Sequence, residues 1–380
     1  MTTARIYNSS TGNWDAVVGG PQGYQGSQGY QGFQGNQGTQ GNQGTSSLTT
    51  NIAGKNFLIN GGMDIWQRGT SFTNTANSII YTSDRWSVFS GVGIAATAQQ
   101  ITSSSTLPTS FQYALRTTRP SGNTSTANIA NQQIIETVNS IPLQGKTVNL
   151  SFWMRVGSGY NQGGISASLV YGTGTDEGVT NLINNAWTGF TRITNLTVTP
   201  TTTWQNYSVS YSVPSTATEI AIQFVTSPAG TATANDYFDI TGVQVELGST
   251  ATAFSRAGAT IGGELALCQR YYLQVTSDAN NAGAILSPLG TANTTSSFYV
   301  PFLLPVTMRA VPSGTVAFAN LQAVDGANSF TITSVGLAGS SNTTQVIILN
   351  ISVTGTLTQF RPYWIRSAIS GGYIGFTAEL

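Results

Sequence analysis

Glycine stands at every third position from Gly20 to Gly44, and no glycine in this stretch falls out of phase. This period is typical of a collagen-type triple helix, in which three extended chains coil about an axis that only a residue without a side chain can occupy. The repeat therefore predicts a homotrimer with a stalk over residues 20–45. The glycines expected at the axis are Gly20, Gly23, Gly26, Gly29, Gly32, Gly35, Gly38, Gly41 and Gly44.

Glutamine fills the third position of every triplet in this repeat, from Gln22 to Gln43. A linker has no reason to hold this register, but Pro21 is the only proline in the repeat, so a flexible Gly/Gln-rich linker is the alternative. As a triple helix the stalk would be roughly 75 Å long, at about 3.1 Å per residue. With so little proline, the folded regions on either side must bring the chains together.

The composition excludes several classes of function. Charged residues make up 7% of the 380 residues and the formal net charge is zero, whereas nucleic-acid binding needs clustered Lys and Arg. The chain has no histidine and a single cysteine, Cys268, which excludes His-dependent triads, zinc sites and an intrachain disulfide. The first residues lack the apolar core of a secretory signal and no segment reaches about 18 apolar residues, so we expect no membrane insertion.

Residues 1–19 are expected to form a β-hairpin from two short strands, Ala4–Asn8 and Trp14–Val18, joined by a turn-rich segment. A single hairpin is only marginally stable. Three copies held together by the stalk would share a small core suited to docking on a larger assembly. The residues of that core are Ile6, Tyr7, Trp14 and Val17. The alternative is a frayed terminus that only starts the triple helix.

Residues 46–55 are small and polar, so we expect them to link the stalk to a first globular domain. From residue 56 to 256, short runs alternate apolar and polar side chains, which predicts a jelly-roll β-sandwich. In the clearest run, Val148, Leu150, Phe152, Met154 and Val156 share one face, and Asn149, Ser151, Trp153 and Arg155 share the other. The same alternation groups Ile220, Ile222 and Phe224, and also Val243, Val245 and Leu247.

The pattern changes after Gly262 and Gly263, where an apolar stripe predicts a short helix. The stripe consists of Leu265, Cys268 and Tyr272, with Leu267, Tyr271 and Val275 beside it. Residues 257–380 otherwise return to short strands, so we expect a second β-sandwich and a mainly β protein overall. The run at residues 344–353 is apolar on both faces, which suits a trimer interface or a central core strand equally well.

Two stretches resemble segments that recur in bacteriophage tail-fibre and related virion fibre proteins. They are NFLINGGMDIWQRGTSF followed by YTSDRW, and TGVQVELGSTATAFSRAGATIGGELALCQRYY; PVTMRAVP and the closing IGFTAEL resemble the ends of the same proteins. In that family these segments bracket a jelly-roll domain similar to carbohydrate-binding modules, and a collagen-like stalk is common before it. The resemblance covers about residues 56–380. It implies a homotrimeric virion appendage that contacts glycans on the host surface.

The resemblance also implies a candidate metal site. In carbohydrate-binding jelly rolls a structural calcium often lies near the starts of the first and last strands, and the nearest counterparts here are Asn60, Asp64 and Asp239. Calcium takes about six to eight oxygen ligands, and this sequence identifies only three. Asp64 could equally bond to backbone amides or pair with Arg68.

Glycans are commonly held by aromatic rings that stack on sugar faces, together with amide and hydroxyl groups. Trp153 is the strongest candidate because it shares a predicted strand face with polar side chains. The full candidate set is Asn149, Trp153, Arg155, Tyr160, Trp187 and Trp204. For each tryptophan the alternative is a core ring whose N–H is bonded to the backbone.

We therefore expect a phage tail fibre that is anchored to another virion protein by residues 1–19 and holds glycan-binding β domains away from the virion. A head or capsid decoration fibre with a structural role is the first alternative. The second is a glycan-cleaving tailspike, which would need a pair of carboxylates at a sugar cleft. Asp176 with Glu177, and Asp236 with Asp239, are the neighbouring acidic pairs, but neither spacing requires catalysis, so we expect no enzyme.

Overall fold

The computed structural model describes residues 4–17, 52–102, 107–277, 283–312, 316–339 and 342–380. It divides into two compact units, residues 1–46 and 47–380, and each is described by itself. The predicted stalk, Gly20 to Gly44, and most of the predicted linker lie outside the described residues. The triple helix therefore stays a prediction from the sequence.

The first unit contains the predicted β-hairpin, in which β1 (Arg5–Asn8) pairs antiparallel with β2 (Asn13–Ala16). Tyr7 lies opposite Trp14, and their ring centroids are 5.1 Å apart. The four candidate docking side chains remain exposed in the single chain, by 65% for Ile6, 55% for Tyr7, 60% for Trp14 and 53% for Val17. The hairpin is confirmed, and its four apolar residues have no core of their own.

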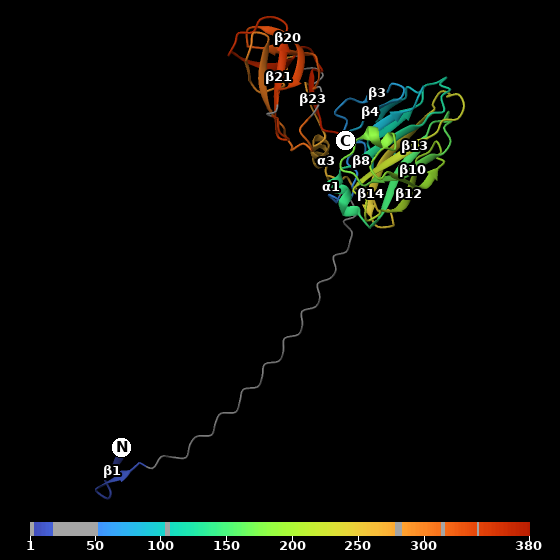
Figure 1. Ribbon diagram of the computed structural model, residues 1–380. Helices are drawn as coiled ribbons and strands as arrows, with labels where there is room; N and C mark the ends of the chain where they lie inside the picture. The colour runs from blue at the N-terminus through green and yellow to red at the C-terminus, as the bar shows by residue number, and fades with distance from the viewer. Residues whose placement is uncertain (1–3, 18–51, 103–106, 278–282, 313–315, 340–341) are drawn as a thin grey trace. The chain divides into compact units, whose positions relative to one another are not determined.

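The first β domain of the second unit packs two antiparallel six-stranded sheets face to face (Figure 1). Sheet I runs, in spatial order, through β11 (Thr191–Val198), β10 (Ile165–Gly172), β13 (Glu219–Thr226), β8 (Ile129–Ile135), β5 (Ser87–Ser90) and β4 (Ser78–Tyr81). Sheet II runs through β12 (Gln205–Ser212), β9 (Thr147–Val156), β14 (Tyr237–Leu247), β7 (Ala114–Thr118), β6 (Thr97–Ile101) and β3 (Ser71–Thr73). The predicted β-sandwich is confirmed. The short helices α1 (Thr137–Ser140), η1 (Ile141–Leu143) and α2 (Val179–Ile183) lie in its connections.

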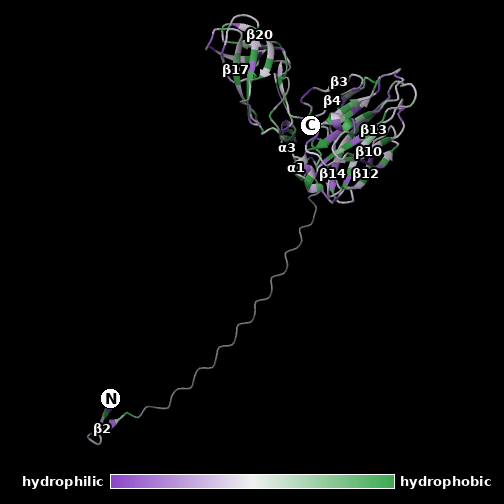
Figure 2. Cartoon of the chain, viewed as in Figure 1, coloured by the Kyte–Doolittle hydropathy of each residue, from purple (hydrophilic) through white to green (hydrophobic). Residues whose placement is uncertain are grey.

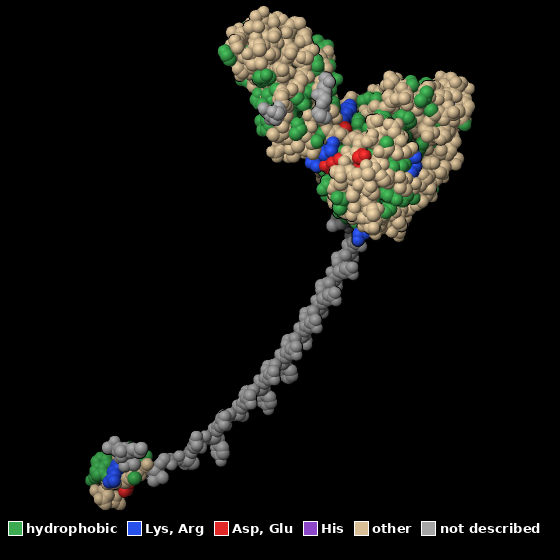
Figure 3. All heavy atoms as spheres, in the orientation of Figure 1, with side chains coloured by type: hydrophobic (Ala, Val, Ile, Leu, Met, Phe, Trp, Pro, Cys, Tyr) green, Lys and Arg blue, Asp and Glu red, His purple; other side chains and the backbone are tan. Residues whose placement is uncertain are grey.

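The core between the sheets follows the predicted alternation, which Figure 2 shows as alternating green and purple along the strands. Val148, Leu150, Phe152 and Met154 of β9 are fully buried, because successive side chains of a strand point to opposite faces. Leu247 departs from the expectation: it ends β14 and is 53% exposed, since the last residue of the strand extends beyond the sandwich core. Figure 3 shows few charged side chains on the visible face of the second unit, as the composition requires.

The second β domain was expected to be a sandwich, and this prediction was wrong. Six strands form a closed barrel in the order β16 (Gly290–Ala292), β17 (Ser297–Leu303), β21 (Val346–Val353), β20 (Ser329–Leu337), β19 (Leu321–Val324) and β22 (Pro362–Ser367). β22 pairs with both β16 and β19 and so closes the ring. A separate sheet consists of β15 (Tyr272–Thr276), β23 (Tyr373–Thr377) and β18 (Ala317–Ala319).

Strand β21 holds the run that is apolar on both faces, and the single chain tests only the core-strand alternative. Ile347, Leu349 and Ile351 are fully buried in the barrel core, whereas Ile348 on the opposite face is half-buried. The run is therefore a core strand of the barrel within this chain.

The predicted helix exists as α3 (Ile261–Gln269), but it is shorter than the apolar stripe suggested. Thr260 caps it, with its side-chain oxygen accepting the Gly263 N–H at 3.1 Å. Tyr272 and Val275 instead belong to β15, because pairing with β23 overrides the helical spacing. Cys268 is buried as expected, and burial raises the pKa of its thiol well above the usual value. Within the described residues, no helix has the length and apolar character needed to cross a membrane.

The two segments that carry the family resemblance pack against each other. The Asn56 amide nitrogen donates to the Val243 carbonyl at 3.0 Å, and its oxygen accepts the Val245 N–H at 3.0 Å. A Cβ at Gly61 would collide with the same Val243 carbonyl, so only glycine allows this close approach to β14. The two segments that carry the resemblance thus connect the start of the first β domain to its last strand.

Candidate functional site

The outer face of sheet I carries its side chains in rows that follow the strand register. Phe89, Ala130, Val225 and Ser166 lie side by side in the first row, on β5, β8, β13 and β10. The second row is polar and consists of Ser87, Gln132, Gln223 and Ser168. The third row consists of Ile134, Ala221, Val170 and Arg192. A mostly apolar strip therefore runs beside a polar strip across four strands.

The third row is largely covered, whereas the first row and two residues of the second, Ser168 and Gln223, line a groove. Leu182, Trp187 and Leu380 pack over Ile134 and Val170 as a small separate core. The groove beside this cover has a volume of about 250 Å³. It is lined by Phe89, Asn128, Ala130, Ser166, Ser168, Ile183, Asn185, Arg192, Thr194, Gln223 and Val225.

A chain of hydrogen bonds fixes the polar groups of the groove. The Gln223 amide nitrogen donates to the Gln132 side-chain oxygen at 2.7 Å, and its own oxygen accepts from Arg192 Nη2 at 2.9 Å and Nε at 3.2 Å. Arg192 Nη2 also donates to Asn185 Oδ1 at 3.1 Å. Gln132 and Gln223 are 0% and 1% exposed, so the polar strip is a fixed part of the sheet.

The chemistry of the groove suits a ligand with an apolar face and polar edges. The first row offers a ring and small apolar groups for packing, and the neighbouring row and loop residues offer hydroxyl and amide groups. A sugar ring has this character, since its C–H groups lie on its faces and its hydroxyls on its rim. Rigid elements carry the side chains, so little order would be lost on binding.

The predicted residues on sheet II share a strand face but do not form a comparable groove. Trp153 and Arg155 are half-buried on the outer face of β9, and the Arg155 guanidinium lies 5.0 Å from the Trp204 ring centroid. Arg155 Nε donates to Asp239 at 2.8 Å. Asn149 is 2% exposed and donates to Ser210 and Ser249, so it belongs to the packed sheet. Asn149 therefore stays an untested candidate, and Arg155 makes an internal ion pair.

The other two aromatic candidates also lie elsewhere. Trp187 is 3% exposed in the small core beside the groove, and its ring N–H donates to the Gly178 carbonyl at 3.2 Å. It cannot stack on a sugar, so this prediction was wrong and the alternative, a core ring, applies. Tyr160 is half-buried with its hydroxyl 3.0 Å from Thr226 Oγ1, outside the groove lining.

The candidate calcium ligands do not fit a calcium ion. The Asn60 side chain is fully used, accepting the Ile65 N–H and donating to the Ile65 carbonyl, Ser83 and Asp84. Asp64 accepts two hydrogen bonds from Arg256, at 2.7 and 3.2 Å, and not from Arg68. Asp239 is held by two arginines. A guanidinium beside each carboxylate occupies the place that a cation would take.

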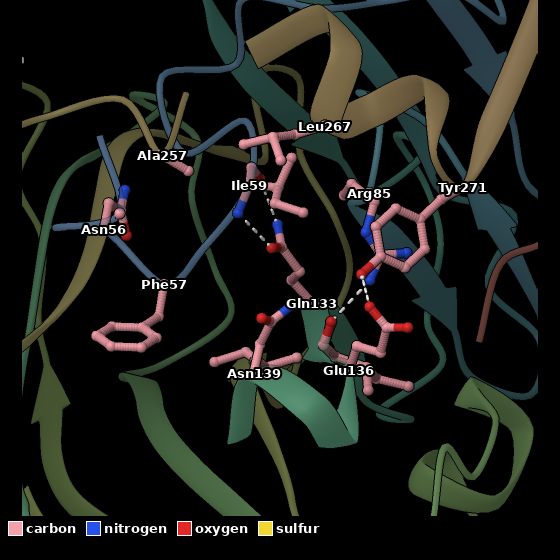
Figure 4. Close-up of a pocket in the computed structure, with 13 residues that line it drawn as sticks. Asn56, Phe57, Ile59, Arg85, Gln133, Glu136, Asn139, Ala257, Leu267 and Tyr271 are labelled. Carbon is pink, nitrogen blue, oxygen red and sulfur yellow. Dashed lines mark hydrogen bonds between the residues drawn. The ribbon is translucent and has the colours of Figure 1, made fainter. Parts of the chain in front are cut away.

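A larger cavity, of about 340 Å³, lies where the first β domain meets α3 (Figure 4). Figure 4 shows the Gln133 amide bonded to the backbone of Ile59, and Glu136 directed at Tyr271. The Arg85 guanidinium stacks 3.5 Å from the Tyr271 ring centroid and also pairs with Glu379. These charged groups have partners in the protein, so their arrangement serves the junction of the two β domains.

One buried carboxyl pair lies beyond the covered row, at the other end of β13. Glu219 is 1% exposed, and its Oε2 accepts the backbone N–H of Glu177 at 2.7 Å. Burial, together with the neighbouring Glu177, raises the pKa of Glu219 to about 7.

The sequence analysis missed the groove residues. Ile220, Ile222 and Phe224 were grouped as a core face, but the opposite face with Gln223 was not considered. The alternation of Ser166 and Ser168 along β10 was an available sign, because it places hydroxyls opposite a buried apolar face. The role of Arg192 depends on its reach across β10 to Gln223, which no local pattern contains.

No protein-family model matches the sequence, and no curated protein matches it. Similar solved structures include the enzymatically active domain of bacteriophage CBA120 tailspike protein 4, at 13% identity and a TM-score of 0.29, over 51% of this chain and 21% of the tailspike chain. The xylan-binding CBM22-1 domain from Paenibacillus barcinonensis Xyn10C is 11% identical, with a TM-score of 0.31, over 52% of this chain and 98% of that domain. This chain thus spans about a fifth of the tailspike. The fold assignment depends on the sheets described above.

Proposed function

We propose that this protein is a trimeric phage tail fibre that holds a glycan-binding β domain away from the virion on a collagen-like stalk. It binds host-surface glycans and does not cleave them. Residues 1–19 attach it to another virion structural protein, and its place of action is the virion and the host cell exterior at infection.

The groove on sheet I is the observation that carries the binding role. It places an apolar row beside a polar row, on strands whose other face is the core of the domain. Arg192 and Gln223 lie in it already oriented by hydrogen bonds. A purely structural fibre has no need of such a groove on the outer face of the sheet, so the groove favours recognition over decoration.

The trimer and the attachment role are supported by the sequence repeat and by the hairpin. Glycine at every third position from Gly20 to Gly44 requires three chains if the segment is a triple helix. Ile6, Tyr7, Trp14 and Val17 are exposed in the single chain, so association with other copies or with a virion protein would cover them. Three weak glycan sites on one stalk would gain avidity, by about 100-fold or more.

Sedimentation of the full chain tests the trimer, which should have three times the mass of the 39.9 kDa chain. A monomer or a dimer would contradict the triple helix. A glycan array probed with the same full chain tests the binding role. Binding to a defined subset of glycans is expected, and the absence of any bound glycan would favour the decoration fibre.

The glycan-cleaving alternative is tested by incubating the full chain with each glycan that it binds. We expect the size of the oligosaccharide to be unchanged in a mass spectrum. Shortened products would instead identify a tailspike enzyme, and the carboxyls of Glu177 and Glu219 would then be the first to substitute.

A further inference from the structure

The charge of Arg192 is the one feature of the groove that a neutral sugar would not use. Among the described residues that line the groove, Arg192 is the only charged one. None of the ion pairs in the described part of the chain includes it, whereas most other arginines there are paired with a carboxylate. Its hydrogen-bond partners are the amide oxygens of Gln223 and Asn185, which are neutral, and its guanidinium carbon lies 5.2 Å from the centroid of the Phe190 ring. The side chain is therefore oriented without being neutralised.

The geometry leaves part of the guanidinium available. Nε and Nη2 make the bonds to Gln223 and Asn185, so they fix the plane of the group. Nη1 makes no hydrogen bond to the described residues and keeps both of its N–H donors. An arginine held in this way offers a strong and directional contact to an oxyanion. The Arg192 side chain is exposed in the single chain, and partial burial of its guanidinium lowers its pKa.

We propose that the ligand of this groove is an acidic glycan, whose carboxylate or sulfate group is bound by Nη1 of Arg192. This inference depends on the proposed glycan-binding function and specifies the class of ligand. The apolar row of Phe89, Ala130 and Val225 packs on the sugar ring, and the anionic substituent lies toward the covered row, where Arg192 emerges. The anion would neutralise the charge of Arg192, which none of the described carboxylates pairs with.

The test uses a glycan array with matched members: uronic-acid oligosaccharides beside their methyl esters, sialylated beside unsialylated chains, and sulfated beside unsulfated chains. The full chain is compared with the Arg192→Gln variant. We expect wild-type binding to select the acidic members, and the variant to lose about tenfold or more of that affinity, as the loss of a charge-assisted hydrogen bond would produce. Added salt should weaken wild-type binding to acidic members and should have little effect on the variant.

Lys146→Gln is the matched control, because Lys146 is exposed on the same β domain, takes part in no ion pair among the described residues, and carries the same charge. It should bind like the wild type, and Arg192→Lys should keep part of the affinity. Thermal unfolding of each variant checks that the fold is intact. Selection of neutral glycans, or acidic binding that is unchanged in Arg192→Gln, would overturn the acidic-ligand inference while leaving glycan binding in place. If no glycan binds, the proposed function fails instead.

Discussion

The charged side chains on the outer faces of sheets I and II have different kinds of partner. On sheet II, Asp239 is fully buried between two arginines, with Arg116 Nε at 2.7 Å and Arg155 Nε at 2.8 Å from its oxygens. On sheet I, Arg192 has only amide partners, and Glu219 faces a second carboxyl. The charges of sheet II are compensated within the protein, whereas those of sheet I are left for a ligand or a proton.

Under the proposed function, this difference divides a structural role and a binding role between the two faces of one sandwich. A buried carboxylate between two guanidiniums holds β7, β9 and β14 in register, since Arg116, Arg155 and Asp239 come from these three strands. The charge of Asp239 is thus compensated within the protein. A fixed arginine without a carboxylate adds nothing comparable to the strand pairing, and its charge is available for recognition.

Substitution of Asp239 should have the largest effect of the changes considered. In Asp239→Ala the two arginines would lose their shared partner inside a packed face, and breaking such a buried pair costs about 3–5 kcal/mol of unfolding free energy. Denaturant unfolding measures this loss. Asp176→Ala is the control, because the Asp176–Arg309 pair is more exposed and should contribute about 1 kcal/mol or less. Equal losses of unfolding free energy in the two variants would show that the buried sheet II cluster contributes no more than a more exposed ion pair.

The contrast between the faces also explains how far the sequence could predict them. Alternation along β9 identified its core face, because burial of a strand depends on a local period of two. The same alternation placed Trp153 and Arg155 on the outer face. It could not show that Arg155 meets Asp239, which lies 84 residues away, because that contact depends on strand order. The closed barrel was missed for the same reason, since β22 pairs with β16 and β19 far along the chain.

The buried pair on sheet I predicts a pH dependence of stability. Burial, and then Glu177, raises the pKa of Glu219 from 4.5 to about 7, so the folded chain holds this proton more tightly than the unfolded chain. The contribution to stability is therefore complete below about pH 4.5 and is lost as the pH rises toward about 7. Glu219→Gln removes this titration, and the amide oxygen can still accept the backbone N–H of Glu177.

Denaturant unfolding of wild type and Glu219→Gln across this pH range measures the effect. We expect the two to be similar at about pH 4 and the variant to be the more stable at about pH 8. The pKa of Asp84 is also raised by burial, to about 6, but its contribution cancels in the difference between the two proteins. If the unfolding free energies of the two proteins changed with pH in parallel, the pKa of Glu219 would not be raised in the folded chain. Glu219 would then not differ from Asp239 in this respect.

The smallest and most direct comparison pairs one aromatic residue from each face. Phe89 lines the groove of sheet I, and Trp153 lies half-buried on the outer face of sheet II. Phe89→Ala should weaken glycan binding by about fivefold, because a stacked ring contributes about 1 kcal/mol, whereas Trp153→Ala should leave affinity unchanged. Titration of each full-length variant with the best-bound glycan measures both values. The opposite result, with Trp153 needed and Phe89 dispensable, would move recognition to sheet II, where Arg155 would then have to exchange its bond to Asp239 for one to the ligand.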